Sequence, residues 1–283
     1  MVSKSGLLAI CVALCGVLVF PLVSRAADAS DKPIRALFIC GGCCHDYLHQ
    51  KDIITKGISA RANVEWTIAY EPSTAQDKLN PIYQNPDWSK GFDVVVHDEC
   101  TSQVKDLDTI NNKILKPHKE GLPAVVLHCG MHCYRSEGWP KAVTPWYELT
   151  GVRSTGHRAQ APIEINFIDK ESPITKGMAD WTTMNEELYN NEYGLLETVH
   201  PLAKGKQTNT DKKTGKEIHF DDVCVWTNMY NGKTKVFATT IGHNNKTCDD
   251  PRYLDLVTRG LLWSVGKLDD SHFHPVKEAS AQK

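Results

Sequence analysis

Short apolar runs alternate with amphipathic or polar segments along the first half of the chain. We expect buried strands at four of these runs, residues 34–40, 64–70, 92–97 and 124–128. Between the first two, residues 48–60 carry Ile54 and Ile58 at helical spacing. Residues 106–120 form a second, polar helix, which Gly121 ends as a C-cap glycine. This alternation predicts an α/β fold, a three-layer flavodoxin-like sandwich with a mostly parallel central sheet and helices on both faces.

The pattern is less regular in the second half. Residues 163–168 alternate apolar and polar positions, as a strand with one exposed face does. Residues 252–265 form an amphipathic helix. Residues 173–193 are rich in loop signals, and the polar residues 204–216 are typical of a hairpin tip at the surface. The remaining predicted elements are a short helix within residues 139–149 and the last strands at residues 223–227 and 235–241.

The start of the chain is typical of an export signal. A lysine, an apolar run and a small-x-small cleavage sequence at residues 24–26 predict a cleaved signal peptide over residues 1–27. A membrane anchor is the alternative, but the apolar run is short and Pro21 lies near its end. We therefore expect one domain over residues 32–268, a polar tail over residues 269–283, and a periplasmic or extracellular location.

Charge and cysteine content narrow the possible partners. A formal net charge of −2 and the lack of basic runs argue against nucleic acid, and no segment after the signal is long and apolar enough to span a bilayer.

Four cysteines stand beside histidines, and for these a disulfide, a thiolate ligand and inert packing all stay open. They are Cys43, Cys44, Cys129 and Cys133.

Histidines follow the ends of several predicted strands. They are His45 after the first strand, His97 after the third, His128 after the fourth and His243 after the last. Segments that leave the carboxyl ends of parallel strands meet at one edge of a sheet, where ligands bind. The sequence therefore predicts a polar crevice that gathers imidazoles and that a metal ion could occupy.

His128 and His132 stand four residues apart at the end of the fourth strand. If this segment is an α-helix, both imidazoles project from one face, as in sites where two histidines share a zinc ion. Cys129 and Cys133 repeat the spacing one position later, so one pair could line a polar pocket while the other packs. As a metal site, the motif predicts a divalent ion, with zinc favoured.

Polar residues near the other strand ends are further candidates. The Gly-Gly turn before His45 does not match G-x-G-x-x-G, so no nucleotide cofactor is expected. Asp98 could be a ligand or general base, or simply part of a solvated loop. His157 lies in a loop with nearby arginines that could bind substrate hydroxyls. Glu187 and Tyr189 lie in an irregular stretch from which they could reach the crevice as acid or base.

Taken together, these segments resemble the ThuA-like (trehalose-utilisation) family, whose fold is similar to that of class I glutamine amidotransferases. The matching pieces are GGCCHDY, VVLHCGMH, GVRSTGH, SPITKGMADW with TTMNEELY, VCVWTNMYNGKTKVFATTIGH and RGLLWSVG. Two departures stand out. Residues 233–236 replace the Gly-Arg-Val that the family usually has, and Cys129 replaces a small residue.

The resemblance implies sugar metabolism, with oxidised (3-keto) glycosides as substrates. Cleavage would follow proton abstraction at C2, so a base, an electrophile on the C3 oxygen and an acid are needed. We expect His128, His132 and His243 to bind the metal or polarise the carbonyl. The residues expected to act as catalytic groups are His45 or Glu187, with Asp98 as a further candidate. Those expected to contact the sugar are His157 and Tyr189 through its hydroxyls, and Trp139, Trp146 or Trp181 by stacking.

Two other functions remain open at this stage. One is a sugar-binding module of the same fold without catalysis. The other is an amidase-like hydrolase that uses Cys129, because class I glutamine amidotransferase-like folds place a cysteine on a strained turn after the corresponding strand. Gly130 suits such a turn, but His128 and Met131 are larger than the small neighbours that it requires.

Overall fold

The computed structural model describes residue 1 and residues 32–276. The predicted signal peptide, apart from its first residue, and the last seven residues of the predicted tail lie outside this part of the chain. Among the described residues, no helix combines the length and apolar character needed to cross a membrane.

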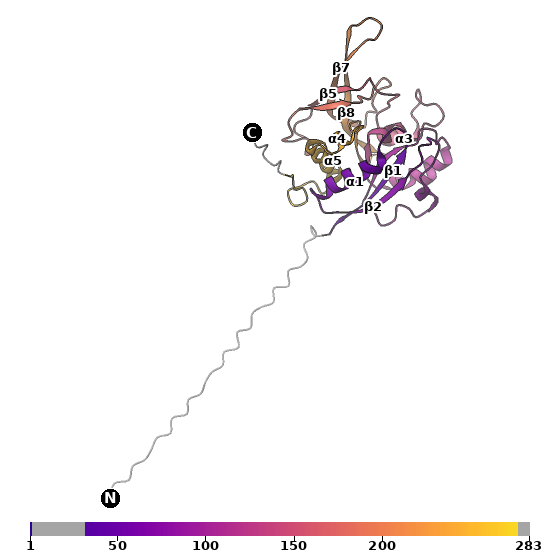
Figure 1. Cartoon of the computed structure of the whole chain (residues 1–283). Coiled ribbons are helices and arrows are strands. Elements are labelled where there is room, and N and C mark those ends of the chain that lie inside the picture. The colour runs from indigo at the N-terminus through magenta and orange to yellow at the C-terminus, as the bar shows by residue number, and fades with distance from the viewer. Residues whose placement is uncertain (2–31, 277–283) are drawn as a thin grey trace.

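A nine-stranded sheet forms the centre of the domain, in the order β2-β1-β3-β4-β9-β8-β7-β5-β6 (Figure 1). Its first five strands in space run parallel, and the remaining pairings are antiparallel. The strands are β1 (Ile34–Gly42), β2 (Val64–Glu71), β3 (Val94–Cys100), β4 (Ala124–Leu127), β5 (Ala161–Phe167), β6 (Trp181–Glu186), β7 (Val199–Thr210), β8 (Glu217–Tyr230) and β9 (Thr234–Thr239).

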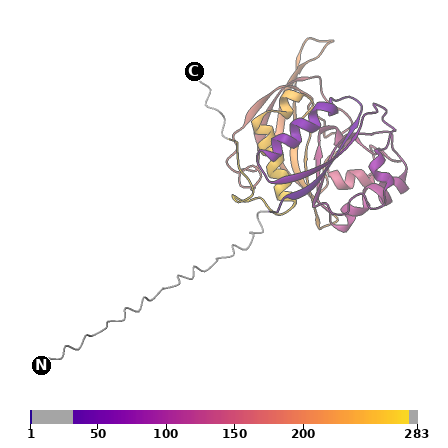
Figure 2. The same ribbon diagram turned by 60° about the horizontal axis from the view of Figure 1, so that its bottom comes forward.

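Helices cover both faces of this sheet. On one face, α1 (Tyr47–Ser59) and α5 (Pro251–Ser264) lie side by side (Figure 2), with α4 (Asn245–Cys248) near their ends. On the other face lie the π-helix η3 (Thr109–Ile114), α2 (Lys116–Glu120) and α3 (Pro145–Thr150). The sheet separates two hydrophobic cores, and alternate residues of β1 belong to different ones. Phe38 packs under α1 and α5, whereas Leu37 and Ile39 face the other layer. The predicted three-layer α/β sandwich is confirmed.

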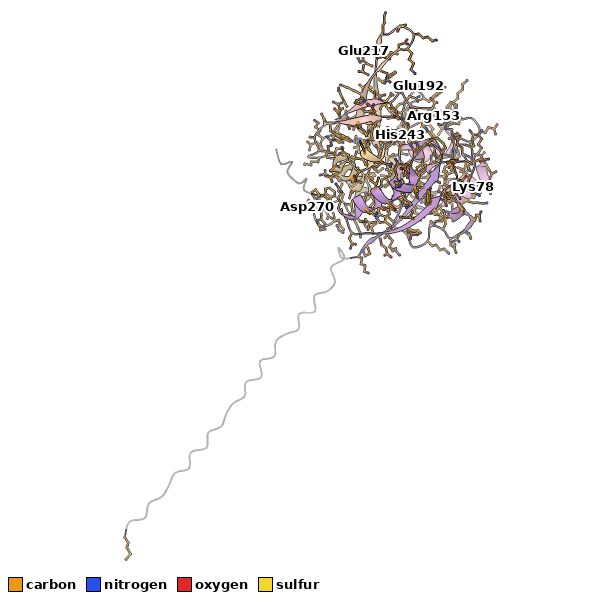
Figure 3. The ribbon with its side chains drawn as sticks, viewed as in Figure 1. Lys78, Arg153, Glu192, Glu217, His243 and Asp270 are labelled. Atoms are coloured by element: carbon orange, nitrogen blue, oxygen red, sulfur yellow. A yellow bond between two sulfur atoms is a disulfide. The ribbon has the colours of Figure 1, made fainter. Side chains whose placement is uncertain are left out.

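The prediction of a mostly parallel sheet was wrong in its extent. Half of the pairings among the described strands are antiparallel, and they include the long β7–β8 ladder. This hairpin projects from the body of the domain, and Glu217 near its tip lies far from His243 (Figures 1 and 3). Because the hairpin projects, its outer part lacks the apolar alternation that marks a strand in sequence, and residues 204–216 read as an insertion.

Three other elements differ from the expected boundaries. The helix expected over residues 106–120 is divided into η3 and α2, and Pro117 lies in the first turn of the second piece. Gly121 does end α2, in the left-handed conformation at φ 118°. The strand β6 lies within the stretch expected to be loop, and α3 is shorter than the helix expected over residues 139–149.

The parallel half of the sheet sets the position of the candidate site. β1, β3, β4 and β9 run in the same direction, so their carboxyl ends lie at one edge. The chain leaves β1 toward His45, β4 directly into His128, and β9 toward His243. The predicted meeting of these segments is therefore confirmed.

Candidate functional site

Three imidazoles from separate strand ends meet at this edge. The ring of His45 lies 4.6 Å from that of His128 and 4.9 Å from that of His243, measured between centroids. One ring nitrogen from each of the three histidines lies within 4.8 Å of the corresponding atoms of the other two. The remaining pair, His128 and His243, has centroids 5.7 Å apart. We call His45, His128 and His243 the imidazole trio.

Tight backbone turns bring the trio together. Gly41 and Gly42 end β1 with φ of 131° and 100°, and a Cβ on either would lie within 2.4 Å of a carbonyl oxygen on a neighbouring strand. Only glycine tolerates both the conformation and the approach. His128 itself adopts a φ of 40°, and Gly130 follows it against the carbonyl oxygen of His97. The residue of this turn with a left-handed backbone is therefore His128.

A backbone contact fixes the tautomer of His128. Its Nδ1 donates to the carbonyl oxygen of Thr240 at 2.6 Å, so Nδ1 carries a proton. In the neutral ring Nε2 is then an acceptor, and the hydroxyl of Tyr189 donates to it at 3.1 Å. The lone pair that His128 offers to the site is therefore on Nε2.

Glu187 lies between several imidazoles. Its Oε2 is 3.2 Å from Nδ1 of His243 and 3.5 Å from Nε2 of His128. Its Oε1 is 3.5 Å from Nε2 of His157 and accepts a hydrogen bond from Gln160 at 3.3 Å. The carboxylate is 8% exposed, so its charge is compensated mainly by these groups.

His132 is close to the trio but points elsewhere. Its Nε2 donates to Ser154 Oγ at 3.0 Å, since that hydroxyl itself donates to a carbonyl oxygen. Its ring stacks on Tyr189 at 4.2 Å. Residues His128–His132 form a 3-10 helix, in which side chains four positions apart diverge by about 120°. The structure therefore groups His45, in place of His132, with His128 and His243.

Burial and neighbouring charges lower the pKa values of His45 and His132. Burial, with His128 and His243 nearby, lowers the pKa of His45 to about 2. Burial and Arg135 likewise lower the pKa of His132 well below its usual value. Both rings are neutral at physiological pH, and a neutral imidazole has a lone pair for a proton or a metal ion.

The pKa values of Glu187 and His243 each shift in the direction opposite to the one that burial favours. Burial alone would raise the pKa of Glu187, but His128 and His243 lower it below its usual range. In return, the contact with Glu187 raises the pKa of His243. Glu187 is therefore ionised at neutral pH, and a proton on His243 is stabilised.

His45, His132, His243 and Glu187 line one cavity of about 230 Å³, and His128 is buried beside Glu187. Beside His45 and His243 it adjoins a shallower hollow that includes Asp46 and Asn244. The cavity lining comprises Cys43, Cys44, His45, Gln76, Cys100, Ser102, Gln103, Cys129, His132, Arg135, His157, Glu187, Tyr189 and His243. Of the residues expected to bind sugar, His157 and Tyr189 are thus placed at the site.

Three residues expected at the site lie elsewhere. Asp98 is within β3 instead of following it, is 4% exposed, and is absent from the described residues that line the cavity. Trp139 is absent from that lining too, and its ring is stacked under the guanidinium of Arg135 at 4.1 Å. His97, also expected after the strand, is buried within it and contacts His118. The strand is longer than its apolar run, which explains the error for Asp98 and His97.

Several residues that position the site were not predicted. The carboxylate of Glu186 accepts hydrogen bonds from the backbone N–H groups of His243 and Asn244, at 3.0 and 2.9 Å. Gln160 donates to His243 Nε2 at 2.9 Å as well as to Glu187. Glu186 stands directly beside Glu187 in an acidic pair, which is the one sequence signal that could have drawn attention to it.

The trio fits a divalent metal ion. The donor set consists of imidazoles, which suit zinc, and the three donor atoms lie within 4.8 Å of one another. In addition, Nδ1 of His45 is buried and has no hydrogen-bond partner among the described groups. The contact between His128 and Thr240 resembles the outer hydrogen bond that orients a metal-binding histidine.

The alternative of a Cys129 thiol nucleophile has little support from this geometry. Cys129 is 4% exposed and is paired with Cys100 in a disulfide. The positive φ that a nucleophile turn requires belongs to His128, one position earlier. A second disulfide joins the adjacent Cys43 and Cys44.

Comparison with a solved structure supports this fold. A solved ThuA-like protein from Parabacteroides merdae is 19% identical, with 83% of this chain and 90% of that chain covered and a TM-score of 0.60. A glutamine amidotransferase from Thermotoga maritima matches at 11% identity over 75% of this chain and 76% of its own, with a TM-score of 0.39. No curated protein matches the chain. The family model described as trehalose utilisation (ThuA) matches residues 38–264, and the chain therefore belongs to the ThuA family.

Proposed function

We propose that this protein is a carbohydrate-active enzyme that cleaves oxidised (3-keto) glycosides. The observation that carries the proposal is the convergence of the imidazole trio and the ionised Glu187 at one cavity, which His45, His243 and Glu187 line and beside which His128 is buried. Membership of the ThuA family supports a sugar as substrate.

The reaction uses the acidity of carbon next to a ketone. A carbonyl at C3 acidifies the proton on C2, and the group on C1 lies β to that carbonyl. Removal of the C2 proton, followed by loss of the C1 substituent, cleaves the glycosidic bond without an oxocarbenium ion. The site must supply a base, stabilise charge on the C3 oxygen, and protonate the departing oxygen.

His45, His128 and His243 are the residues that would hold a divalent ion. When bound, the ion supplies Lewis acidity toward a carbonyl oxygen. His132 is not one of these residues, and its ring stacks on Tyr189 in the cavity wall.

Glu187 is the better of the two expected bases. It is ionised at neutral pH and lies within 3.5 Å of His128 and His243, whereas His45 is one of the three residues that would hold the ion, and a metal-bound imidazole has no lone pair left for a proton. His157 and Tyr189, both on the cavity wall, would orient sugar hydroxyls. Asp98 and Trp139 lie outside the described cavity lining and have no role in the proposed reaction.

The test is metal analysis combined with cleavage of a 3-keto-glucoside that bears a chromogenic aglycone. We expect His45→Ala and His128→Ala each to lose bound metal and to reduce cleavage at least a hundredfold. His132→Phe, which keeps an aromatic stack on Tyr189, should retain its metal. Sugar binding without turnover by the wild type would instead identify a sugar-binding module, and cleavage unaffected in both alanine variants would exclude the trio.

We further propose that the protein is exported, with residues 1–27 as its cleaved signal. Support comes from the charged start, the apolar run and the small-residue cleavage sequence. Amino-terminal sequencing of the protein recovered from a bacterial periplasm should give a chain that begins near residue 28. A chain that keeps its first residues and stays in the cytoplasm would contradict export.

A further inference from the structure

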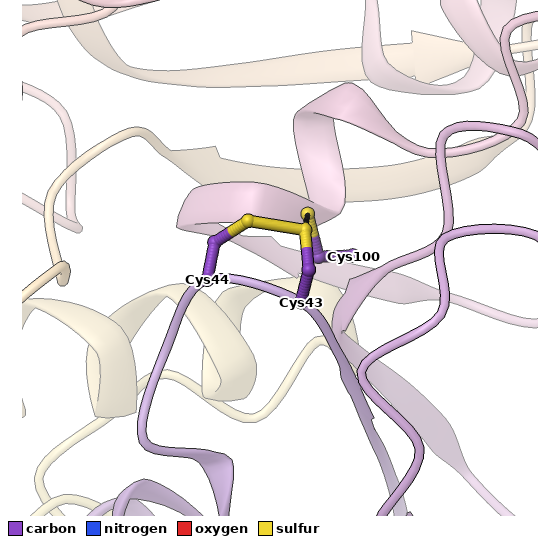
Figure 4. Close-up of side chains that lie close together, drawn as sticks. All are labelled: Cys43, Cys44 and Cys100. Atoms are coloured by element: carbon purple, nitrogen blue, oxygen red, sulfur yellow. Dashed lines mark hydrogen bonds between the residues drawn. A yellow bond between two sulfur atoms is a disulfide. The ribbon is translucent and has the colours of Figure 1, made fainter.

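Four cysteines form a continuous line of sulfur atoms along one wall of the cavity. The disulfide Cys43–Cys44 comes from the turn after β1, and the disulfide Cys100–Cys129 joins the end of β3 to the turn after β4. Between the two, Cys43 Sγ lies 3.5 Å from Cys100 Sγ (Figure 4). All four residues line the cavity.

Exposure decreases along this line. Cys44 is exposed at the surface, Cys43 is 9% exposed, and Cys100 and Cys129 are each 4% exposed. A thiol in solution therefore has access to the outer disulfide and little access to the inner one. Since disulfides exchange by attack of a thiolate on a neighbouring sulfur, a contact of 3.5 Å places the inner bond within reach of the outer cysteine.

We propose that these cysteines form a thiol–disulfide exchange site that accepts two electrons from a dithiol. The dithiol attacks Cys44 Sγ, and Cys43 Sγ leaves as a thiolate. The second thiol of the reductant then releases Cys44 as a thiol, and the reductant becomes a disulfide. The thiolate of Cys43 attacks Cys100 Sγ, and Cys129 Sγ leaves and takes up a proton. The product holds one disulfide, Cys43–Cys100, and two thiols, at Cys44 and Cys129.

A side chain beside Cys43 suits its role as leaving group and attacking group. The amide of Gln76 donates a hydrogen bond to Cys43 Sγ at 3.1 Å. Ser102 donates to the amide oxygen of Gln76 at 3.0 Å, so the amide nitrogen is directed toward the sulfur. Hydrogen-bond donors stabilise a thiolate, and Arg135, on the same cavity wall, adds positive charge.

The exchange would act directly on the imidazole trio. Cys44 immediately precedes His45, and Cys129 immediately follows His128. Moving the cross-link from Cys100–Cys129 to Cys43–Cys100 releases the turn that carries His128 and fastens the turn that carries His45. The inference goes beyond the proposed sugar chemistry and does not depend on it.

The test is the identity of the cross-link in Cys44→Ser. This variant cannot form the outer disulfide, so the thiol of Cys43 is free to exchange. After acid quenching, alkylation and digestion without reductant, mass spectrometry should find Cys43–Cys100 as the major cross-linked peptide and Cys129 alkylated. Cys224→Ser, at a buried thiol outside this line, should keep both original disulfides. Only Cys100–Cys129 in Cys44→Ser, or no cross-link, would overturn the proposal.

A second measurement uses the wild-type protein and does not depend on the folding of the variant. One equivalent of dithiothreitol, added with a chelator present, should expose Cys44 and Cys129 to alkylation and leave Cys43–Cys100 intact. In Gln76→Glu, whose carboxylate disfavours a thiolate at Cys43, this product should form about tenfold more slowly. Alkylation of Cys43 and Cys44 with Cys100–Cys129 retained would show that the two bonds do not communicate.

Discussion

Nδ1 of His128 donates a hydrogen bond of 2.6 Å to the carbonyl oxygen of Thr240, and this contact joins the ends of β4 and β9. It fixes the proton on Nδ1 and leaves the lone pair of Nε2 toward Tyr189 and Glu187. The hydroxyl of Tyr189 now occupies that lone pair at 3.1 Å. A metal ion on Nε2 must therefore displace this hydroxyl.

Tyr189→Phe should consequently strengthen metal binding. The variant removes a hydrogen bond that must be broken when the ion binds, and such a bond is worth about 1 kcal/mol, or about fivefold in affinity. The stack on His132 is kept, because the ring remains. Isothermal titration with zinc would measure the change, with Tyr147→Phe, which lies outside the described cavity lining, as control. Weaker binding in Tyr189→Phe would mean that the hydroxyl supports the ion.

The sequence predicted how the site is assembled better than which histidines compose it. His45, His128 and His243 follow apolar runs, and the rule that parallel strands end at one edge was enough to bring them together. The exclusion of His132 depends on whether five residues wind as an α-helix or a 3-10 helix. That difference comes from packing around Gly130, which no spacing rule describes.

Contacts between distant segments were beyond the sequence for a similar reason. Thr240, Glu186 and Gln160 act through the positions of their neighbours in space, and nothing in their local sequence indicates those neighbours. In the antiparallel half of the sheet, β7 and the outer part of β8 were not predicted as strands, because the outer β7–β8 hairpin is polar on both faces. Apolar–polar alternation in the sequence predicts only strands that have a buried face.

Asp98→Asn should stabilise the protein, and the gain should grow with pH. Burial and the nearby Glu99 raise the pKa of Asp98 to about 8, whereas its ordinary value is 3.8. The unfolded wild type therefore releases this proton from about pH 4 upward while the folded protein retains it, so folding loses stability up to about pH 8. Asparagine does not titrate, and the difference between variant and wild type should increase by roughly 1 kcal/mol per pH unit.

Urea unfolding of both proteins at intervals from pH 4 to pH 8 would measure this difference. Cleavage should also survive the substitution, because Asp98 is absent from the described cavity lining. A difference that stays constant with pH would show that the carboxyl group is not held in its neutral form.

Tyr83→Phe should cost more stability than Tyr134→Phe. The hydroxyl of Tyr83 donates to Glu99 Oε1 at 2.7 Å inside the protein, and the acceptor is shared with His97. Tyr134 only donates to Tyr83, at 3.4 Å. Losing a buried bond to a carboxylate costs about 1.5–3 kcal/mol, whereas a long bond between hydroxyls contributes about 1 kcal/mol or less. Denaturant midpoints at neutral pH would rank the two variants, and equal costs would contradict the hydrogen bond to Glu99.

Gly42→Ala and Gly156→Ala test whether the turn after β1 controls the metal site. Each glycine lies near a histidine of the cavity, His45 or His157, but only Gly42 has a positive φ, and its Cβ would lie 2.4 Å from the carbonyl oxygen of Cys100. We expect Gly42→Ala to lose about 2 kcal/mol or more of stability, and to bind metal more weakly, because the backbone that carries His45 must shift. Gly156 has open space where its Cβ would be, so its alanine variant should stay within about 0.5 kcal/mol of the wild type. Thermal unfolding with and without added zinc separates the effect on stability from the effect on metal binding. If the turn positions His45, zinc should raise the Tm of Gly42→Ala less than the Tm of Gly156→Ala. Equal shifts in Tm would show that the trio forms independently of this turn.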